Sequence, residues 1–356
     1  MRKYSVVIAL MGFVLTANGQ GVAAFYDELG NFKVFDAGEF KQLEHLAVKQ
    51  YGVGGDYVAY VDARDNFKLY YQGEVHELFN LVPRLFRTTD YFLYYHVDNQ
   101  IKAFGGGEIL DIEKWSRISK GVGDSLLVYY DRNNYFKVWY GGQSHELEIW
   151  QVNSFKASDN VVAWVNKNGT FKVFWRGEVT DLEVISPKHY FVGKNIIGYI
   201  DTDNFFKIWY NGELIEVDGF NPKSFKVGDN MVAYVSDLGI FTLFYKGEFR
   251  QMSKIVPRSY RCVENLLIYI DANGYFNIVH QGKQIMLESF TPPDRYYVDN
   301  DVVAYKGIDG RLKAFYKGET VDISEDICTW MRLVGDVILF KTGENEMKVF
   351  WDGRRW

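Results

Sequence analysis

The stretch FKVWYGGQSHELE at residues 136–148 returns 35 residues later as FKVFWRGEVTDLE at residues 171–183. Two related segments at a fixed spacing indicate a repeat architecture. The glycine of their shared Y-x-G-E pattern recurs along the chain at Gly38, Gly73, Gly107, Gly142, Gly177, Gly212, Gly247, Gly282, Gly318 and Gly353. The intervals are 35, 34, 35, 35, 35, 35, 35, 36 and 35 residues, so ten copies follow one another without a linker.

Each copy contains four short strand-like runs. In residues 224–253 they read SFKV (run A), MVAYV (run B), IFTLFY (run C) and EFRQM (run D). Short turns separate the four runs, and a longer link leads to the next run A. This link holds all six prolines: Pro83, Pro187, Pro222, Pro257, Pro292 and Pro293. Three hairpins and one link predict a four-stranded antiparallel meander in every copy.

The pairing of runs C and D can be predicted from charge. If the turn consists of the Y-x-G glycine and the residue before it, Lys137 faces Glu146 and Phe136 faces Leu147. The same register pairs Lys68 with Glu77, Lys102 with Asp111, Lys172 with Asp181, Lys207 with Glu216 and Lys313 with Asp322. The two copies without the lysine also lack the acid, since Thr242 faces Gln251 and Asn277 faces Met286. We therefore expect the lysines and acids to fix strand register.

Run C is apolar on both faces, which requires a sheet packed on each side. Phe136 and Val138 lie on one face, and Trp139 lies on the other. Small sheets stacked around an axis satisfy this requirement, and the whole pattern resembles a β-propeller with the blade plan of WD40-like folds. The resemblance covers the plan only, because the GH…WD signature is absent and the period is shorter than 40–45 residues. It implies that run A is innermost and run D outermost.

The expected fold is therefore all-β, a β-propeller of about ten short four-stranded antiparallel blades. An open stacked β-repeat array is the alternative. The first copy starts at run B (VAAFYD), and the last copy stops shortly after its run D begins (RRW). The first blade should thus lack its inner strand, the last should carry only a short outer strand, and closure of the ring stays open.

The N-terminus has the order of a cleaved secretory signal. Arg2 and Lys3 precede the apolar run SVVIALMGFVLT at residues 5–16, and small residues precede a cut before Gln20. We expect residues 1–19 to be a signal peptide and residues 20–356 to form one ten-repeat domain. The mature protein would be periplasmic or secreted, with no membrane span after cleavage.

Composition narrows the class of partner. The 356 residues are 47% hydrophobic and 17% aromatic, with a net charge of −6 and no basic block, so nucleic acid is not an expected partner. The only two cysteines, Cys262 and Cys328, lie two repeats apart, and we expect them not to form a disulfide.

Catalytic and metal motifs are absent from the sequence. It contains no HExxH, CxxC, GxSxG, P-loop or dinucleotide-binding fingerprint, so no enzyme activity, metal or cofactor is predicted. Asp62 with Asp65, and Asp201 with Asp203, resemble calcium loops, but further ligands are missing and aspartates favour turns in any case.

The strongest candidate binding residues are cations on run A. They share one repeat position shortly before the A–B turn: Arg87, Lys156, Lys226, Arg261 and Arg332. On an innermost strand they would face the channel and attract an acidic partner. The acids Asp90, Asp159, Asp229 and Glu264 follow them closely and would weaken that field.

Two functions remain open from the sequence. The first is an exported, non-catalytic scaffold that binds a protein partner in the cell envelope, in one version an accessory or plug subunit of an outer-membrane export machine. The alternative is a carbohydrate-binding protein or a hydrolase or lyase with its site at the channel mouth, which needs at least two converging carboxylates.

Overall fold

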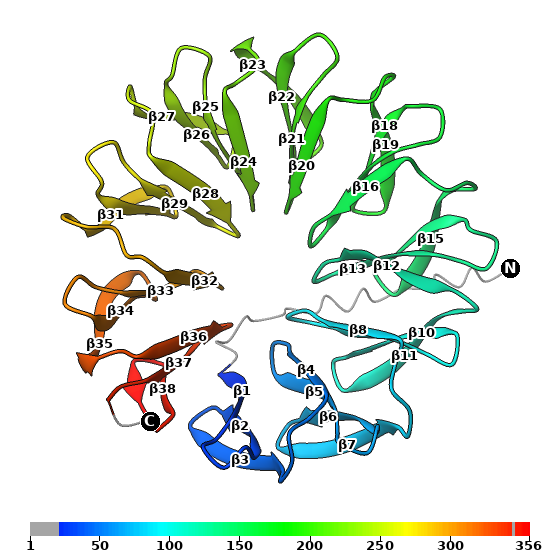
Figure 1. The fold of residues 1–356 in the computed structure, drawn as a ribbon. Helices are drawn as coiled ribbons and strands as arrows, with labels where there is room; N and C mark the ends of the chain where they lie inside the picture. Colours follow the sequence, from blue (N-terminus) through cyan, green and yellow to red (C-terminus); the bar gives the residue numbers. More distant parts are fainter. Residues whose placement is uncertain (1–20, 344–345) are drawn as a thin grey trace, which may run out of the picture.

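A computed structural model describes residues 21–343 and 346–356, which form ten antiparallel sheets arranged as the blades of a ring (Figure 1). No helix occurs in these residues. The predicted signal peptide lies outside them. The described part of the chain holds no helix of the length and apolarity that a membrane crossing requires. Cys262 and Cys328 are both free, as predicted.

The strands follow the chain order from blade to blade. Blade 1 holds β1 (Val22–Tyr26), β2 (Phe32–Asp36) and β3 (Glu39–Glu44); blade 2 holds β4 (Gln50–Val53), β5 (Tyr57–Val61), β6 (Phe67–Tyr71) and β7 (Glu74–Phe79); blade 3 holds β8 (Leu85–Thr88), β9 (Leu93–Val97), β10 (Gln100–Gly105) and β11 (Glu108–Lys114). Blade 4 holds β12 (Arg117–Val122), β13 (Leu126–Tyr130), β14 (Phe136–Tyr140) and β15 (Gln143–Glu148); blade 5 holds β16 (Ser154–Ala157), β17 (Val161–Val165), β18 (Phe171–Trp175) and β19 (Glu178–Glu183); blade 6 holds β20 (His189–Gly193), β21 (Ile196–Ile200), β22 (Phe205–Tyr210) and β23 (Glu213–Phe220).

The remaining four blades repeat this arrangement. Blade 7 holds β24 (Ser224–Gly228), β25 (Met231–Val235), β26 (Phe241–Tyr245) and β27 (Glu248–Ser253); blade 8 holds β28 (Ser259–Val263), β29 (Leu266–Ile270), β30 (Phe276–His280) and β31 (Lys283–Glu288). Blade 9 holds β32 (Tyr296–Asp299), β33 (Val302–Lys306), β34 (Arg311–Tyr316) and β35 (Glu319–Ile327); blade 10 holds β36 (Trp330–Val334), β37 (Val337–Lys341), β38 (Lys348–Trp351) and β39 (Arg354–Arg355).

The blade plan predicted from the sequence is confirmed. The first strand of each four-stranded blade lies next to the channel and the last lies at the rim (Figure 1). Within the residues that the structure describes, blade 1 has three strands and β39 has two residues.

The register of the third and fourth strands is also confirmed at the turn. Both turn residues have positive φ, as in Gln72 (49°) with Gly73 (85°) and Lys246 (51°) with Gly247 (94°). This geometry belongs to a two-residue type I′ turn, which a long side chain before the glycine does not prevent. Lys137 pairs with Glu146 as expected.

One residue further on, the prediction was wrong. A bulge between Phe136 and Lys137 places Phe136 opposite Glu148, rather than opposite Leu147. The extra residue turns Leu147 toward the apolar cluster around Phe136 and presents the carboxylate of Glu148 to the next blade.

The ion-pair partners of the run C lysines also differ from the prediction, because the bulge turns a glutamate of the outer strand toward the next blade. Lys207 binds Glu183 of the preceding blade at 2.7 Å and Asp201 of its own B–C turn at 3.0 Å. Glu216 stands opposite Lys207 in the strand register, as predicted, but it is not its ion-pair partner. We call such contacts the lysine clasps. They comprise Lys68 with Glu44 and Asp62, Lys137 with Glu113 and Asp131, Lys172 with Glu148, Lys207 with Glu183 and Asp201, and Lys313 with Glu288.

Two of the six predicted ion pairs do form within one blade. Lys102 binds Asp111 at 2.7 Å and Lys172 lies 3.5 Å from Asp181. Lys102 has no clasp because Phe79 stands in the preceding blade where the others have glutamate.

The hydrophobic core lies between the blades. Phe136, which is fully buried, stacks on Phe155 and Trp164 of the following blade. Tyr199 and Trp209 of blade 6 share a cluster with Val173 of blade 5. Run C is thus buried on both faces, as its two apolar sides predicted.

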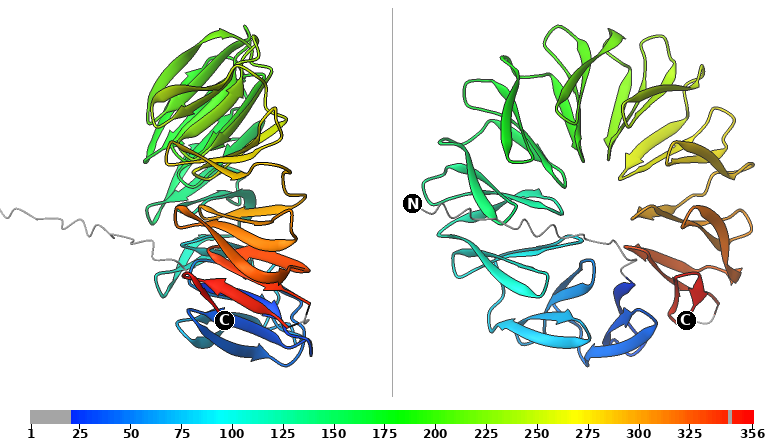
Figure 2. Two further views of the ribbon diagram at one scale, coloured as in Figure 1. Left: turned by 90° about the vertical axis from the view of Figure 1, so that its left-hand side faces the viewer. Right: turned by 180° about the vertical axis from the view of Figure 1, so that it is seen from behind.

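Packing between blades 1 and 10 closes the ring. Ala23 and Phe25 of β1 share a cluster with Val337, Leu339 and Val349. The backbone N–H of Gly21 donates to Asp336 Oδ1 at 3.0 Å. The view from behind shows a complete circle of blades (Figure 2, right), so the open stacked array is excluded.

An antiparallel meander gives the ring two distinct faces. The A–B and C–D turns lie on one, which we call the hairpin face. The B–C turns and the D–A links lie on the other, which we call the link face. Figure 2 shows the ring edge-on as a flat disc with these two sides.

Candidate functional site

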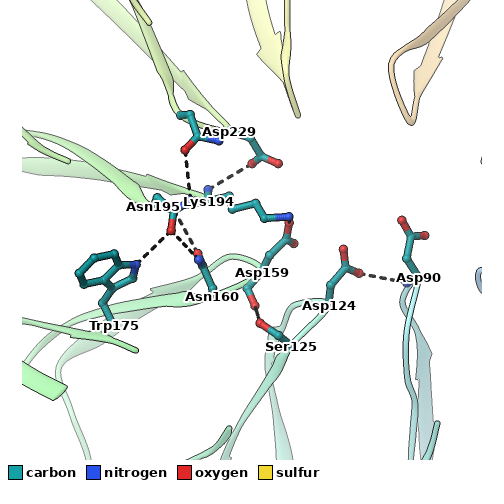
Figure 3. A network of polar contacts seen from close by, with 10 residues as sticks. Asp90, Asp124, Ser125, Asp159, Asn160, Trp175, Lys194, Asn195 and Asp229 are labelled. Carbon is teal, nitrogen blue, oxygen red and sulfur yellow. Dashed lines mark hydrogen bonds and ion pairs between the residues drawn. The ribbon is translucent and has the colours of Figure 1, made fainter. Parts of the chain in front are cut away.

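The A–B turns of neighbouring blades are joined side to side at the channel mouth of the hairpin face (Figure 3). Asn195 is the centre of this network: its Oδ1 accepts from Asn160 Nδ2 at 2.6 Å and from Trp175 Nε1 at 3.0 Å, and its Nδ2 donates to Asn230 Oδ1 at 3.1 Å. Asn195 has a φ of 60°, which asparagine tolerates better than most residues. We call Asn160, Asn195 and Asn230 the asparagine ladder.

Carboxylates from several blades converge beside this ladder. Burial and the charges of Asp159 and Asp90 raise the pKa of Asp124 to about 7. Burial and Asp159 raise the pKa of Asp229 to about 6. Lys194 lies among them, with its Nζ 3.6 Å from Asp159 (Figure 3). Burial acts to lower the pKa of Lys194, but Asp159, Asp229 and Asp124 outweigh it and raise that pKa.

The same mouth continues on the opposite side of the ring. Burial, then Asp299 and Asp229, raise the pKa of Glu264 to about 8. Asp90 of blade 3 also contributes to that shift, although Glu264 belongs to blade 8. Burial raises the pKa of Asp299 to about 6, and Asp90 adds to it. The carboxylates therefore act on one another across the channel. We call Asp90, Asp124, Asp159, Asp229, Glu264, Asp299 and Asp301 the acidic ring.

The acidic ring offers two kinds of chemistry. A mouth lined by carboxylates attracts cationic groups. A carboxyl that stays protonated near pH 7, such as Glu264, beside ionised carboxylates is also the arrangement that acid–base catalysis uses. Within residues 21–343 and 346–356, no group of three or more His, Cys, Asp or Glu side chains is placed to hold a metal ion.

The run A cations occupy the inner strands, but three of them lie against aromatic rings. Lys156 Nζ donates to the backbone oxygen of Tyr190 at 2.6 Å and lies 4.0 Å from the centre of the Phe191 ring. Burial lowers the pKa of Lys156. Arg261 stacks on Tyr296 at 4.4 Å.

Arg332 is the third cation beside an aromatic ring, and within the described residues the remaining two of the five have no such neighbour. Arg332 donates to the Tyr51 hydroxyl at 2.6 Å, whereas Arg87 and Lys226 are exposed. The structure thus places all five on inner strands and brings Lys156, Arg261 and Arg332 against neighbouring strands. Contact of these five residues with an acidic partner stays a prediction.

The aspartate turns at Asp62 and Asp201 use their oxygens within the protein. Asp62 Oδ1 accepts from the backbone N–H groups of Arg64 and Asn66 at 2.8 and 2.9 Å, and Oδ2 lies 2.8 Å from Lys68 Nζ. Asp201 makes the same contacts with Asp203, Phe205 and Lys207. These contacts give each carboxylate a structural role in its turn and its clasp.

The link face carries exposed large apolar side chains around the ring. Leu29, Val184, Phe290 and Leu238 are each at least 80% exposed. The others, on the links, the B–C turns and the end of β35, are Leu46, Leu81, Val82, Trp115, Ile149, Trp150, Ile185, Ile255, Val256, Ile308 and Ile327. We call this set the apolar array. Exposed apolar surface, where it is contiguous, marks an interaction site, and the link face is the candidate for one on this ring.

Sequence reasoning missed the apolar array and the acidic ring. The signal for the array was available, because the links carry apolar pairs such as Ile149-Trp150 and Val184-Ile185 where connections are usually polar. The acids were noticed only as neighbours of the run A cations, since their convergence depends on closure of the ring.

Comparison with known proteins bears on the fold. The family described as a 10-bladed beta propeller domain matches residues 16–356. No curated protein matches the chain. The chain is similar to the computationally designed Ika8 protein, at 16% identity and a TM-score of 0.35 over 85% of this chain and 96% of that one.

Two natural proteins give similar values. Prp20p from Saccharomyces cerevisiae matches at 8% identity and a TM-score of 0.34, over 63% of this chain and 84% of that one. BamB from Moraxella catarrhalis matches at 12% identity and a TM-score of 0.32, over 74% of this chain and 95% of that one. These likenesses carry no argument about function.

Proposed function

The chain belongs to the family of ten-bladed β-propeller domains, and we propose that it is an exported, non-catalytic scaffold that binds a protein partner through its link face. The N-terminal charge, apolar run and small residues support export. In the cell envelope, the specific form of this role is an accessory or plug subunit of an outer-membrane export machine.

The apolar array carries this proposal. Side chains such as Val184 (84% exposed) and Phe290 (83% exposed) leave most of their surface in water, which is unfavourable in a free protein. A flat face with apolar groups spaced around it suits a partner with a broad surface. Trp150 lies on this face with Lys167 Nζ 4.8 Å from its ring centre, and tryptophan is among the residues enriched at protein interfaces.

Capture from the native cell envelope tests the proposal. The test variant replaces Trp150, Val184 and Phe290 with serine, and the matched control replaces Val75 and Val179, exposed valines on outer strands, with serine. We expect stoichiometric capture by the original chain and the control, and at least a tenfold loss in the test variant. Equal capture by the three proteins would reject the link face as the binding surface.

The acidic ring supports a second candidate function, a carbohydrate-binding protein or a hydrolase or lyase with its site at the channel mouth. The requirement of converging carboxylates is met, because Glu264 is affected by Asp229, Asp299 and Asp301. Screening against a panel of glycans, with Glu264→Gln as the control, tests this alternative. Glycan turnover that Glu264→Gln removes would favour it over the scaffold.

A further inference from the structure

Blade 3 differs from the other blades at its link-face end. Its B–C turn consists of Asp98 and Asn99 alone, whereas the same turn in blade 2 spans residues 62–66. The shorter turn allows β10 and β11 to pair as far as Gln100 and Lys114. The ends of these two strands form a cleft of about 230 Å³, lined by Gln100, Ile101, Asp111, Ile112, Glu113 and Lys114.

A buried histidine beside this cleft has a ring nitrogen without a hydrogen-bond partner. His96 stands directly opposite Ile101 in the strand register, so the two side chains share the face of the sheet that packs on blade 4. In blade 2 the same two positions hold Val61 and Phe67. His96 is 5% exposed, and its Nε2 has no partner. Burial of a polar atom without a partner opposes folding, and a bound molecule would supply that partner.

Ser116 presents a second unpartnered group at the same end of blade 3. It follows β11 closely, and its backbone N–H donates to the oxygen of Asn99 in the B–C turn at 3.4 Å. Ser116 is 8% exposed, and its Oγ has no partner. The imidazole nitrogen of His96 can donate or accept one hydrogen bond, and the serine hydroxyl can do both. The two groups therefore suit a ligand that carries hydroxyls.

Trp115, directly before Ser116, has a backbone conformation that bulky residues rarely adopt. Its φ is 59°, and a hydrogen bond from its N–H to the Asn99 oxygen at 2.7 Å holds the chain in this conformation. Trp115 is 64% exposed, so this conformation is not explained by burial of the indole. Strained backbone of this kind is concentrated at functional sites. Because Lys114 lines the cleft, the exposed indole follows it directly in the chain.

The charges and the size of the cleft indicate a small neutral ligand. Asp111 is paired with Lys102 at 2.7 Å, and Glu113 lies 3.4 Å from Lys137 of blade 4. Both carboxylates thus have a cation of their own, and the cleft has no unpaired negative charge to attract another. Sites for drug-sized ligands have volumes of roughly 300–1,000 Å³, so this cleft suits a smaller molecule.

We propose that this cleft binds one sugar ring of a glycan, with Trp115 stacked on the ring and with His96 and Ser116 bonded to its hydroxyls. A sugar ring combines a face of apolar C–H groups with a rim of hydroxyls. An exposed indole beside buried polar atoms matches both parts. The paired carboxylates of Asp111 and Glu113 keep lone pairs that accept from further hydroxyls.

This site is separate from the two binding surfaces described above. It lies at the link-face end of blade 3, whereas the acidic ring lies at the channel mouth of the hairpin face. Trp115 belongs to the apolar array, but the capture variant changes Trp150, Val184 and Phe290 and leaves Trp115 in place. Sugar binding and partner capture can therefore fail independently.

Titration calorimetry with the methyl glycosides of glucose, galactose and mannose tests the proposal on the purified protein. We expect at least one glycoside to bind saturably. Trp115→Gly should weaken that binding at least tenfold, because it removes the ring, and Ser116→Ala should weaken it by about threefold to tenfold. Both variants should melt at the original temperature or above it, because they remove backbone strain and a buried unpartnered hydroxyl. A residue with only a structural role would not give this combination.

The matched control is Trp330→Gly, which removes a tryptophan of blade 10 that is 42% exposed and should leave glycoside binding unchanged. Trp115→Tyr keeps an aromatic ring and should retain most of the binding. The proposal is overturned if none of the three glycosides binds saturably, or if Trp115→Gly binds as well as the original chain. Equal losses in Trp115→Gly and Trp330→Gly would also overturn it, and so would binding that only Glu264→Gln removes, which would move the sugar to the channel mouth.

Discussion

The two faces of the ring are built from the same ten repeats, but electrostatic interactions between blades have opposite signs on them. On the link face, the lysine clasps join a cation of one blade to acids of its own turn and of the preceding blade. On the hairpin face, the acidic ring brings like charges together, with the asparagine ladder holding the turns.

The pKa values record this difference. Burial acts to raise the pKa of Asp62, but hydrogen bonds from Lys68 and Asn66 hold it well below its usual range. Burial and neighbouring acids raise the pKa of Glu264 to about 8. Attraction between blades thus stabilises the link face, whereas on the hairpin face like charges repel one another and protonation relieves that repulsion. The acidic ring on the hairpin face and the apolar array on the link face are therefore the two candidate binding surfaces of this propeller.

The largest effect should follow from breaking a lysine clasp. Lys207→Met leaves Glu183 and Asp201 without their shared cation, and the lysine side chain is only 12% exposed. We expect a loss of about 2–3 kcal/mol in the free energy of unfolding, measured in urea. The matched control is Lys102→Met, whose partner Asp111 is 70% exposed, with an expected loss below about 1 kcal/mol. Equal losses would show that the clasps do not join blades.

The asparagine ladder should give the next largest effect. Asn195→Ala leaves the indole N–H of Trp175 without its acceptor and puts alanine at a φ of 60°. The expected loss is about 2 kcal/mol by urea denaturation. Asn195→Gly keeps the backbone conformation accessible, so a smaller loss separates the hydrogen bonds from the strain. If Asn195→Ala is as stable as the original chain, the ladder does not hold the hairpin face.

The pH dependence of stability should separate the two faces. The pKa of Glu264 is raised from 4.5 to about 8, so its stabilising protonated form is fully present below pH 4.5 and is lost as pH rises to 8. The lowered pKa of Asp62 has the opposite sign, since its contribution is present above pH 3.8 and is lost at lower pH. Maximal thermal stability should therefore lie near pH 4–5.

Glu264→Gln should flatten the alkaline side of this profile alone. We expect it to raise the free energy of unfolding by about 1 kcal/mol at pH 8, with little change at pH 4. A variant that is destabilised equally at both pH values would show that Glu264 is held ionised by contacts rather than strained by its neighbours.

The smallest effect on stability should come from the run A cations. Replacing Lys156, Lys226 and Arg261 together with glutamine should cost about 1 kcal/mol or less, because these charges are exposed or partly exposed. The same variant should bind an acidic partner more weakly, most clearly at low salt. A much earlier melting transition, or unchanged binding in pull-down, would make these cations structural.

The sequence was sufficient for the blade plan because each blade is defined by short-range pairing. The Y-x-G turn fixes Lys137 opposite Glu146 whatever the rest of the ring does. Contacts between blades could not be predicted in this way. The clasp of Lys207 with Glu183 depends on a bulge in the preceding blade, and Asp90 affects Glu264 only because ten blades close a circle. The bulge and the circle are properties of packing, which repeat spacing does not encode.

Cross-linking of the native complex tests the central claim, binding of a protein partner through the link face, most directly. Lys167, Lys188 and Lys254 lie on the link face, and Lys246 and Lys317 lie in the C–D turns of the hairpin face. With a short amine-reactive linker and mass spectrometry, we expect partner cross-links from the first three lysines and none from the other two. Cross-links from Lys246 and Lys317 alone would contradict the account and move the partner to the acidic face.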